Sequence, residues 1–371
     1  MPEPFSLADR LGPEKIVHIY EPALGLRAIV VIDNTALGPA IGGTRMARDV
    51  SLKECFRLAR AMTLKNAAAG LPHGGAKSVI FGDPAMPRGE KEEIIRAFAV
   101  AIRDLAGYIP GPDMGTNEEA MAWIRDEIGR SVGLPRVVGG IPLDEIGATG
   151  YGLAAAAVAA EAHGGPQVAG ARVAVQGFGA VGQHAARFLA EKGAVLVAAS
   201  DTHGTIADPN GLDIGALMAM KAGGGALPAY AKGRKLDRDA IIGVPCDIWI
   251  PAARPDVLTA DNVGRLDTRL VLQGANIPAT LEAEKILHER GILSIPDFIA
   301  NAGGVICASV EYHGGSEASA LTTIAERIGR NTHEVLADVR GQGLQPREAA
   351  GRLAERRVAA AMALRRWHRP K

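Results

Sequence analysis

The sequence has few cysteines, no net charge and no long apolar run, and each absence excludes a class of protein. Its 371 residues include three cysteines, Cys55, Cys246 and Cys307, an odd number without close spacing. This usage fits reduced thiols and argues against a disulfide framework or a zinc site. We therefore expect a cytoplasmic protein without a bound metal.

Charge and hydropathy exclude further partners. Lysine plus arginine and aspartate plus glutamate both total 41, so nothing in the global charge points to nucleic acid or to an anionic membrane. No apolar run reaches membrane-spanning length. The first residues also lack the basic region and apolar stretch of a signal peptide. The chain length and the 47% of hydrophobic residues instead suggest two domains with substantial cores.

Alternating β runs and helical segments predict an α/β protein with a parallel, doubly wound sheet in the middle of the chain. The β runs lie at 172–176, 194–200, 246–250, 270–273 and 292–295, with helices over 149–163, 183–191 and 280–289. Further strands are expected at 15–20 and 26–33, and helices from Ser51, over 90–106, from Asn117, over 318–340 and over 347–367. The glycine- and proline-bearing segments 37–46, 71–84 and 108–117 are expected to be loops.

A glycine motif follows the β run at 172–176 and precedes the helix at 183–191. Its residues are Gly177, Phe178, Gly179, Ala180, Val181 and Gly182. In this setting the glycines permit a turn, a close approach to a pyrophosphate and tight packing of helix on strand. Asp201 ends the next β run, where a carboxylate accepts from ribose hydroxyls and repels a 2′-phosphate. The motif therefore favours NAD over NADP; the alternative is a structural glycine turn that binds no nucleotide.

Two lysines and one aspartate are candidate catalytic or binding residues. Lys77 follows two glycines inside apolar sequence, and a desolvated lysine has a lowered pKa that suits a base near neutral pH. Lys65 falls near the end of a predicted helix and Asp113 lies in a segment rich in glycine and proline. Each also has a structural explanation: a surface lysine, a cation at a helix C-terminus and a cap for the helix that begins near Asn117.

Over nearly its whole length, the chain resembles the glutamate/leucine/phenylalanine/valine dehydrogenase family. The segment 71–84 matches the active-site signature of that family in its fixed positions, with His73 in place of the usual apolar residue. The segment 42–46 resembles leucine dehydrogenase, whereas 148–152, 177–179 and 301–305 are more similar to glutamate dehydrogenase. The substrate-pocket motifs are closest to leucine dehydrogenase.

The resemblance implies a fold and a set of roles. It implies a substrate-binding and oligomerisation domain of residues 1–138 plus 331–371, a Rossmann-type dinucleotide-binding domain of residues 139–330, and a deep cleft between them. Lys65 would grip the substrate carboxylate, Lys77 would activate water, and Asp113 would relay protons to and from the amine. Further substrate contacts would come from Gly42, Gly43 and Asn301. Cofactor contacts would come from Thr149, Gly177, Phe178, Gly179, Ala180, Val181, Gly182, Asp201, Ala252 and Asn276.

The side-chain pocket decides the substrate class. The glutamate enzymes of the family place a lysine where this chain has Ile41 and a serine where it has Ala308. Without either partner, a buried γ-carboxylate would cost several kcal/mol. An apolar pocket lined by Ile41, Gly111, Val305 and Ala308 is therefore expected.

The sequence thus predicts an oxidoreductase, a homo-oligomeric amino-acid dehydrogenase. It would use NAD to convert an apolar L-amino acid of the leucine, valine, isoleucine or phenylalanine type reversibly to its 2-oxo acid and ammonia. One alternative is a glutamate dehydrogenase. A second is a non-catalytic NAD-binding regulatory subunit.

Overall fold

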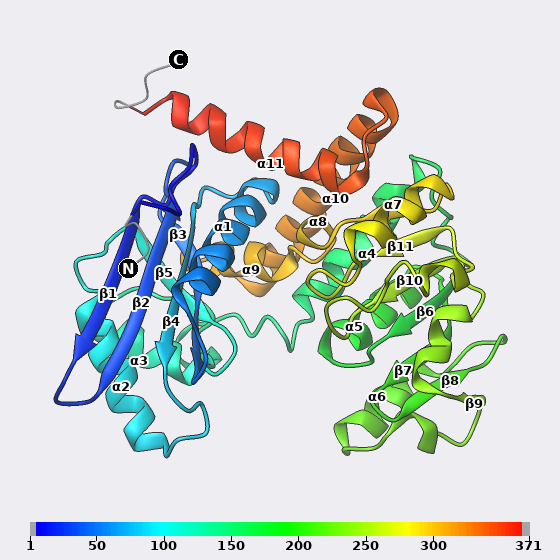
Figure 1. Ribbon diagram of the computed structural model, residues 1–371. Helices are drawn as coiled ribbons and strands as arrows, with labels where there is room; N and C mark the ends of the chain where they lie inside the picture. Colours follow the sequence, from blue (N-terminus) through cyan, green and yellow to red (C-terminus); the bar gives the residue numbers. More distant parts are fainter. Residues whose placement is uncertain (1–4, 366–371) are drawn as a thin grey trace. The chain divides into compact units, whose positions relative to one another are not determined.

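The computed structural model describes residues 5–365 and divides them into two compact units. Unit 1 contains residues 5–142, 305–320 and 353–365, and unit 2 contains residues 143–304 and 321–352. Each unit holds one β-sheet with helices packed on it (Figure 1). The predicted two-domain α/β fold is confirmed. The units divide the last third of the chain differently from the expected boundaries at 138 and 330.

The sheet of unit 1 has five strands in the order β1-β2-β4-β3-β5. Strands β1–β2 and β2–β4 pair antiparallel, whereas β3 pairs parallel with both β4 and β5. Because β3 lies between β4 and β5, residues far apart in the sequence become neighbours across three strands. The bounds are β1 (Lys15–Glu21), β2 (Leu26–Asn34), β3 (Ala40–Ala47), β4 (Gly75–Phe81) and β5 (Tyr108–Pro112).

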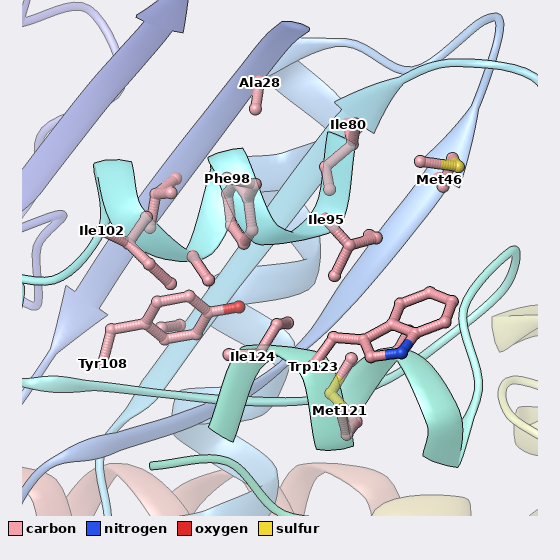
Figure 2. Packing of buried hydrophobic residues seen from close by; sticks show 14 of the residues in the cluster. Ala28, Met46, Ile80, Ile95, Phe98, Ile102, Tyr108, Met121, Trp123 and Ile124 are labelled. Atoms are coloured by element: carbon pink, nitrogen blue, oxygen red, sulfur yellow. The ribbon is translucent and has the colours of Figure 1, made fainter. Parts of the chain in front are cut away.

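Helices cover both faces of this sheet, and the alternation of side chains along β2 shows how. Ala28, Val30 and Ile32 pack against α2 and α3, while Ile29 and Val31 face α1. Figure 2 shows the first of these cores, with Phe98 and Ile95 of α2 facing Ile80 of the sheet. The helices are α1 (Leu52–Ala68), α2 (Arg88–Ala101) and α3 (Glu118–Ile128).

Three segments expected to be loops are strands. The segments 37–46, 71–84 and 108–117 contain β3, β4 and β5. Their glycines indicated turns, but here they permit close packing within the sheet: a Cβ on Gly42 would lie 1.7 Å from the carbonyl oxygen of Ala76, and one on Gly75 would lie 2.0 Å from the backbone nitrogen of Thr63 in α1.

The sheet of unit 2 has seven strands in the order β12-β11-β10-β6-β7-β8-β9. The five strands from β12 to β7 are parallel, which confirms the predicted doubly wound sheet. The antiparallel edge strands β8 and β9 were not predicted. The bounds are β6 (Arg172–Gln176), β7 (Val195–Asp201), β8 (Gly204–Ala207), β9 (Arg234–Leu236), β10 (Ile248–Pro251), β11 (Leu270–Leu272) and β12 (Leu293–Ile295).

The remaining helices follow the expected alternation in most places. Those of the middle of the chain are α4 (Ala148–Glu161), α5 (Ala180–Ala190), α6 (Ile214–Ala222), α7 (Leu281–Glu289) and α8 (Asp297–Ala300). Those of the last part are α9 (Gly303–Tyr312), α10 (Glu317–Gln342) and α11 (Pro346–Ala363). Short 3₁₀ helices lie at η1 (Arg136–Val138), η2 (Leu227–Ala229), η3 (Arg238–Gly243) and η4 (Val263–Arg265). The segment 301–305 contains the start of α9.

The second half of α11 packs within unit 1. Arg357 donates to the carbonyl oxygens of Ala67 and Ala68 at the C-terminus of α1, and Arg365 pairs with Glu14 at 3.2 Å. The last residues of the chain, among them Arg366 and Trp367 at the end of the helix predicted over 347–367, lie outside the described residues. The three cysteines are buried free thiols. Within residues 5–365, no helix is long and apolar enough to cross a membrane.

Candidate active site

Lys77 sits in the middle of β4 on the face of the sheet that α1 covers. Alternation along the strand puts Lys77 and Val79 on one face, and Val79 packs in the core beneath α1. The Lys77 side chain is only 7% exposed. Below it, the thiol of Cys55 in α1 donates to the Lys77 carbonyl oxygen at 3.4 Å. The strand therefore holds this ammonium inside the protein, and the reading of Lys77 as a surface lysine is wrong.

Asp113 directly follows β5 and meets Lys77 across β3. The Lys77 Nζ lies 2.5 Å from Asp113 Oδ2. The same oxygen accepts from Arg45 Nε at 3.1 Å, and Arg45 also pairs with Glu54 at 2.5 Å. The helix that follows is capped by Asn117, so a capping role for Asp113 is wrong. Nothing in the sequence pattern had indicated that Arg45 and Glu54 extend this ion pair to four charged groups.

The electrostatics of the pair follow from its burial. Burial lowers the pKa of Lys77 from the usual lysine value, Arg45 lowers it further, and Asp113 opposes both. Burial alone would raise the pKa of Asp113, but the charge of Lys77, the N–H of Met114 and the charge of Arg45 together hold it below the usual value. The site therefore contains a carboxylate beside an amine that loses its proton more readily than an exposed lysine does.

Gly43 leaves the space into which this pair projects. A Cβ on Gly43 would lie 2.9 Å from Lys77 Nζ and 2.9 Å from Asp113 Cβ. The register pairs Gly43 with Gly111 of β5. The backbone of β3 is therefore bare beside the ion pair, where a substrate atom can approach.

Lys65 lies in the last turn of α1 and is partly buried. The helix approaches β4 closely here, since Thr63 contacts Gly75 two residues before Lys77. The neighbouring Asn66, which sequence analysis missed, donates to the carbonyl oxygens of Gly74 and Ile41 at 2.7 and 3.3 Å. This end of α1 is thereby tied to the starts of β3 and β4, on the face that carries Lys77.

The residues predicted to line the side-chain pocket lie beside these strands within unit 1. Ile41 and Ala308, which are 3% and 9% exposed, belong to one buried cluster with Ile109 and Val132, two residues that sequence analysis did not name. Gly111 contributes to it because a Cβ there would lie 3.1 Å from Val132 Cγ2. Val305 is partly buried on the same helix as Ala308.

A partly buried carboxylate, that of Glu311, joins two segments that contribute to this cluster. Glu311 of α9 accepts from the backbone N–H groups of Gly133 at 2.7 Å, Leu134 at 3.2 Å and Ile141 at 2.7 Å. Burial raises the pKa of Glu311 while these three donors lower it. The bonds join the loop that carries Val132 to the helix that carries Ala308. His73, the departure from the family signature, is buried and its Nδ1 lies 3.0 Å from the Pro39 carbonyl oxygen.

In unit 2 the glycine motif forms the predicted strand–turn–helix. Gly177 has φ of +94°, a Cβ on Gly182 would lie 2.1 Å from the Gly177 carbonyl oxygen, and Gly179 faces open space. Helix α5 begins at Ala180 directly after this turn. Its free N–H groups and the bare Gly179 suit a pyrophosphate. In addition, Gln176 Oε1 at the end of β6 is buried without a hydrogen-bond partner among residues 5–365.

The other predicted cofactor residues gather at the carboxyl ends of the parallel strands. A Cβ on Gly274 would lie 3.3 Å from Val181 Cγ1 and 3.4 Å from Ala252 Cβ, so the turn of α5 and the ends of β10 and β11 meet here. Asn276 Oδ1 accepts from Asn301 Nδ2 at 3.0 Å. Ligands in doubly wound sheets bind at this edge.

Thr149 lies in the first turn of α4, close to the start of α9. A Cβ on Gly304 would lie 3.6 Å from Thr149 Oγ1. The Asn301 amide also donates to the carbonyl oxygens of Gly274 and Ala275, and its own oxygen is buried with no partner in the described chain. Thr149 and Asn301 thus both lie close to the N-terminus of α9.

Asp201 ends β7 as predicted, but its carboxylate already accepts hydrogen bonds from other groups of unit 2. Its Oδ2 accepts from Lys221 Nζ and Leu227 N, both at 2.9 Å, and its Oδ1 accepts from His203 N at 2.9 Å. The side chain is only 8% exposed. In the part of the chain that the structure describes, no cluster of three or more histidine, cysteine or acidic side chains is arranged to hold a metal ion.

Comparison with known proteins supports this description of both units. Residues 13–130 match the family model described as the Glu/Leu/Phe/Val dehydrogenase dimerisation domain, and residues 139–366 match the model of Glutamate/Leucine/Phenylalanine/Valine dehydrogenase. The chain is 39% identical over 359 residues to a glutamate dehydrogenase of Aeropyrum pernix, covering 90% of this chain and 85% of that protein.

Two further relatives show the same relationship. An NADP(+)-dependent glutamate dehydrogenase of Pyrobaculum calidifontis is 41% identical over 313 residues, covering 79% of this chain and 73% of its own. The solved structure of the hetero-hexameric glutamate dehydrogenase of Thermus thermophilus in its Leu-bound form is similar with a TM-score of 0.82 and 30% identity, over 96% of this chain and 91% of that one. The chain therefore belongs to the glutamate/leucine/phenylalanine/valine dehydrogenase family and is an amino-acid dehydrogenase, an oxidoreductase that acts on CH–NH₂ groups with a nicotinamide coenzyme.

Proposed function

We propose that this dehydrogenase deaminates apolar L-amino acids. The observation that carries the proposal is the buried cluster of Ile41, Ile109, Val132 and Ala308 beside the Lys77–Asp113 pair. These side chains offer neither a charge nor a hydrogen bond to a substrate side chain. Burying an aliphatic side chain here gains about 1.5–3 kcal/mol, whereas an unpaired carboxylate would lose several.

Glutamate is the second candidate substrate. Both sequence relatives described above are named glutamate dehydrogenases, and these names favour glutamate more than leucine. The Thermus thermophilus structure is named a glutamate dehydrogenase and yet is described as a Leu-bound form. Family membership therefore does not decide whether the side chain of the substrate is acidic or apolar. The residues lining the proposed pocket support an apolar side chain.

In the proposed reaction, Lys77 and Asp113 each carry out a different proton transfer. The coenzyme, when bound, accepts the hydride from the substrate Cα. Neutral Lys77 takes a proton from the water that attacks the resulting iminium carbon. Asp113 carries protons between the amine and Lys77, and the C–N bond breaks as ammonia leaves with the 2-oxo acid. Lys65 pairs with the substrate α-carboxylate, and Gly43, which has no side chain, leaves the β3 backbone beside the ion pair open to the substrate, whereas Gly42 packs against Ala76.

The residues of unit 2 fit a dinucleotide. The turn at 177–182 would hold the pyrophosphate, and Thr149, Ala252 and Asn276 would contact the nicotinamide end. The sequence favoured NAD because of Asp201, whereas the Pyrobaculum calidifontis relative is named NADP(+)-dependent. We propose that this protein accepts both coenzymes. Because the matched first model is described as a dimerisation domain, we also propose a homo-oligomer, which light scattering of the purified protein tests.

A panel of amino acids, each with NAD and with NADP, tests the substrate proposal through the absorbance of the reduced coenzyme. We expect turnover of leucine, valine, isoleucine, methionine or phenylalanine and little turnover of glutamate. Turnover of glutamate with none of the apolar amino acids would establish the second candidate instead. Coenzyme binding without turnover of any amino acid would support a non-catalytic regulatory subunit.

A further inference from the structure

Arg347 lies in the first turn of α11 and its side chain is largely buried in unit 2, with 23% exposed. Its guanidinium donates two hydrogen bonds to the carboxylate of Glu284 in α7, at 2.6 and 2.7 Å. A third bond, at 2.9 Å, goes to Oε1 of Gln273, which directly follows β11. A bidentate pair of this kind fixes the orientation of both side chains. The start of α11 is therefore anchored at the end of β11.

Asp297 is a second carboxylate beside the same guanidinium. Its Oδ1 lies 2.9 Å from Arg347 Nη1, outside hydrogen-bond geometry, so that the contact is an ion pair. The Asp297 side chain is 8% exposed, and its backbone N–H donates to Gln273 Oε1 at 3.2 Å. One arginine thus compensates the charges of two buried carboxylates, those of Glu284 and Asp297. Removal of the arginine would leave both without the cation that offsets their burial.

The other oxygen of Asp297 holds the loop that follows β11. Asp297 Oδ2 accepts from the N–H of Ile277 at 2.9 Å, and the carbonyl oxygen of Ile277 accepts from the N–H of Asp256 at 2.9 Å. Ile277 has φ of +47° and Asp256 has φ of +52°, and no other residue except glycine has a positive φ within residues 5–365. A β-branched side chain disfavours this conformation, so the surrounding contacts must hold it. The hydrogen bond to Asp297 is one of those contacts.

Asn276, the predicted contact of the nicotinamide end, immediately precedes Ile277 in this loop. Its Oδ1 accepts from Asn301 Nδ2 at 3.0 Å, and the backbone N–H of Asn301 donates to the carbonyl oxygen of Asp297 at 2.7 Å. Asp297 therefore holds the loop with its side chain and Asn301 with its backbone. A displacement of Asp297 would move both amides.

We infer that Arg347 is a positioning residue for the coenzyme. Through its ion pair with Asp297 it keeps Ile277 in the strained conformation, and this conformation places the amide of Asn276 where the nicotinamide end binds. A loop that is already ordered loses less conformational entropy when the ligand binds. The inference rests on the proposed function for the identity of the coenzyme and for the role of Asn276.

Fluorescence titration with NADH, in the absence of any amino acid, tests this inference together with the melting temperature. Arg347→Met should weaken NADH binding by about tenfold, because the loop must then be ordered on binding. Arg347→Lys keeps the charge without the bidentate geometry and should weaken it less. A lower melting temperature of Arg347→Met with unchanged NADH affinity would overturn the inference, since Arg347 would then only anchor α11.

Asp297→Asn provides a second variant in case Arg347→Met folds poorly. The amide keeps the shape of the side chain and an oxygen that accepts from Ile277, but it loses the ion pair with Arg347. NADH binding should weaken by less than in Arg347→Met and still measurably. Unchanged binding in Asp297→Asn would likewise overturn the inference.

Glycine at position 277 gives a result that a merely structural role of Arg347 would not. Glycine adopts positive φ without strain, so the loop no longer needs a contact to hold it there. The effect of Arg347→Met is therefore measured again in the Ile277→Gly background, as a double-mutant cycle. There it should weaken NADH binding by less than about threefold. An equal loss in both backgrounds would show that Arg347 does not act through Ile277.

Arg290→Met is the matched control within unit 2. Arg290 joins the end of α7 to η4 by donating to the carbonyl oxygens of Val263 and Leu266, at 2.7 and 2.6 Å, and these bonds lie outside the loop 274–277. The control should leave NADH affinity unchanged. A loss equal to that of Arg347→Met would reduce the effect to a general weakening of unit 2 and would overturn the inference.

The outcomes separate this inference from the proposed function. The expected losses of NADH affinity without turnover of any amino acid would count against the proposed function alone. Turnover by the unaltered protein together with unchanged NADH affinity in Arg347→Met would count against this inference alone.

Discussion

The Lys77 Nζ lies 2.5 Å from Asp113 Oδ2 although Lys77 belongs to β4, Asp113 directly follows β5, and β3 lies between these two strands. The parallel pairing of β3 with both neighbours brings them together, and the bare backbone at Gly43 leaves room for the contact. The pairing of the strands thus brings together the two groups that we propose to exchange protons, an arrangement that favours catalysis by fixed geometry.

Removing the amine tests the catalytic role of Lys77. Lys77→Ala should lower kcat by about 10²- to 10⁴-fold, the usual contribution of a positioned acid or base. The affinity for the coenzyme should stay nearly unchanged, because the dinucleotide residues all lie in unit 2. Stopped-flow kinetics and a fluorescence titration measure the two quantities. Wild-type turnover in the variant would mean that another group is the base.

The control for this variant is a lysine that lies in the same unit but away from the site. Lys91 of α2 donates to the carbonyl oxygen of Pro84 and is partly exposed. Lys91→Ala should leave kcat unchanged. A loss equal to that of Lys77→Ala would point to a general effect of charge on unit 1 rather than to chemistry at the active site.

The pH dependence of the reaction should respond to Arg45. In the proposed reaction Lys77 acts in its neutral form, so we expect the rate to rise with pH through the pKa of Lys77, which lies below the usual lysine value. Arg45 lowers this pKa because it is a like charge close to the ammonium. Arg45→Met removes that repulsion, the ammonium becomes more stable, and the rising limb of the kcat/KM profile should move to higher pH.

Glu54 provides the opposite comparison. Its carboxylate pairs with Arg45 at 2.5 Å. Arg45 contacts Asp113, the partner of Lys77, whereas Glu54 is linked to this pair only through Arg45. Glu54→Gln should therefore leave the rising limb close to its original position while Arg45→Met moves it. If the rising limb of the kcat/KM profile moves to lower pH in Arg45→Met, Arg45 does not lower the pKa of Lys77 in the way proposed.

The sequence predicted local units well because their signals are local. The strand at 172–176, the glycine turn and the helix after it occupy adjacent positions, and the structure has β6 at the predicted bounds. Ser51 was correctly expected to start a helix, since its Oγ accepts from the N–H of Glu54 at 3.2 Å. The short edge strands β8 and β9, of four and three residues, gave no recognisable alternation.

The spacing of residues in the sequence did not predict which distant strands pair with one another. Glycines in the segments that form β3 and β4 usually mark turns, and only the opposing backbone of Ala76 or α1 explains why glycine is needed in a strand. The contact between Lys77 and Asp113 was expected from the family resemblance alone. Arg45 lies two residues after Gly43 on the same face of β3, so strand alternation could have indicated it once β3 was recognised.

Gly43 offers a test that leaves every charged group in place. In Gly43→Ala the new methyl carbon would lie 2.9 Å from Lys77 Nζ and from Asp113 Cβ, which is closer than real contacts allow. The pair must move, and a displacement of about 1 Å can cost about 10²-fold in rate. We expect that loss in kcat with a nearly unchanged melting temperature, because the flexible lysine can yield.

Variants at two other glycines serve as comparisons for Gly43→Ala, one with ample space for a methyl group and one with none. Gly89→Ala in the first turn of α2 meets nothing within 4 Å and should not affect kcat. Gly42→Ala would place a Cβ 1.7 Å from the Ala76 carbonyl oxygen, so that variant should fold poorly. Full activity in Gly43→Ala would show that the ion pair has more room than the structure gives it.

Substrate choice should change when the apolar cluster receives polar groups. Ile41→Lys together with Ala308→Ser supplies a cation and a hydroxyl at two positions of the buried cluster. A buried ammonium without a partner is costly, and the γ-carboxylate of glutamate relieves that cost; breaking such a pair costs about 3–5 kcal/mol. The ratio of kcat/KM for glutamate to that for leucine should therefore rise by about 10²- to 10³-fold.

The single variants separate charge from shape. Ile41→Leu keeps the pocket apolar at nearly constant volume and should change the leucine-to-glutamate ratio by less than about tenfold, since such swaps cost under about 1.5 kcal/mol. Glutamate should raise the melting temperature of the double variant more than leucine does, because only glutamate pairs with the new ammonium. If the double variant folds and still turns over leucine in preference to glutamate, Ile41 and Ala308 do not contact the substrate side chain. The apolar specificity must then be assigned to other residues.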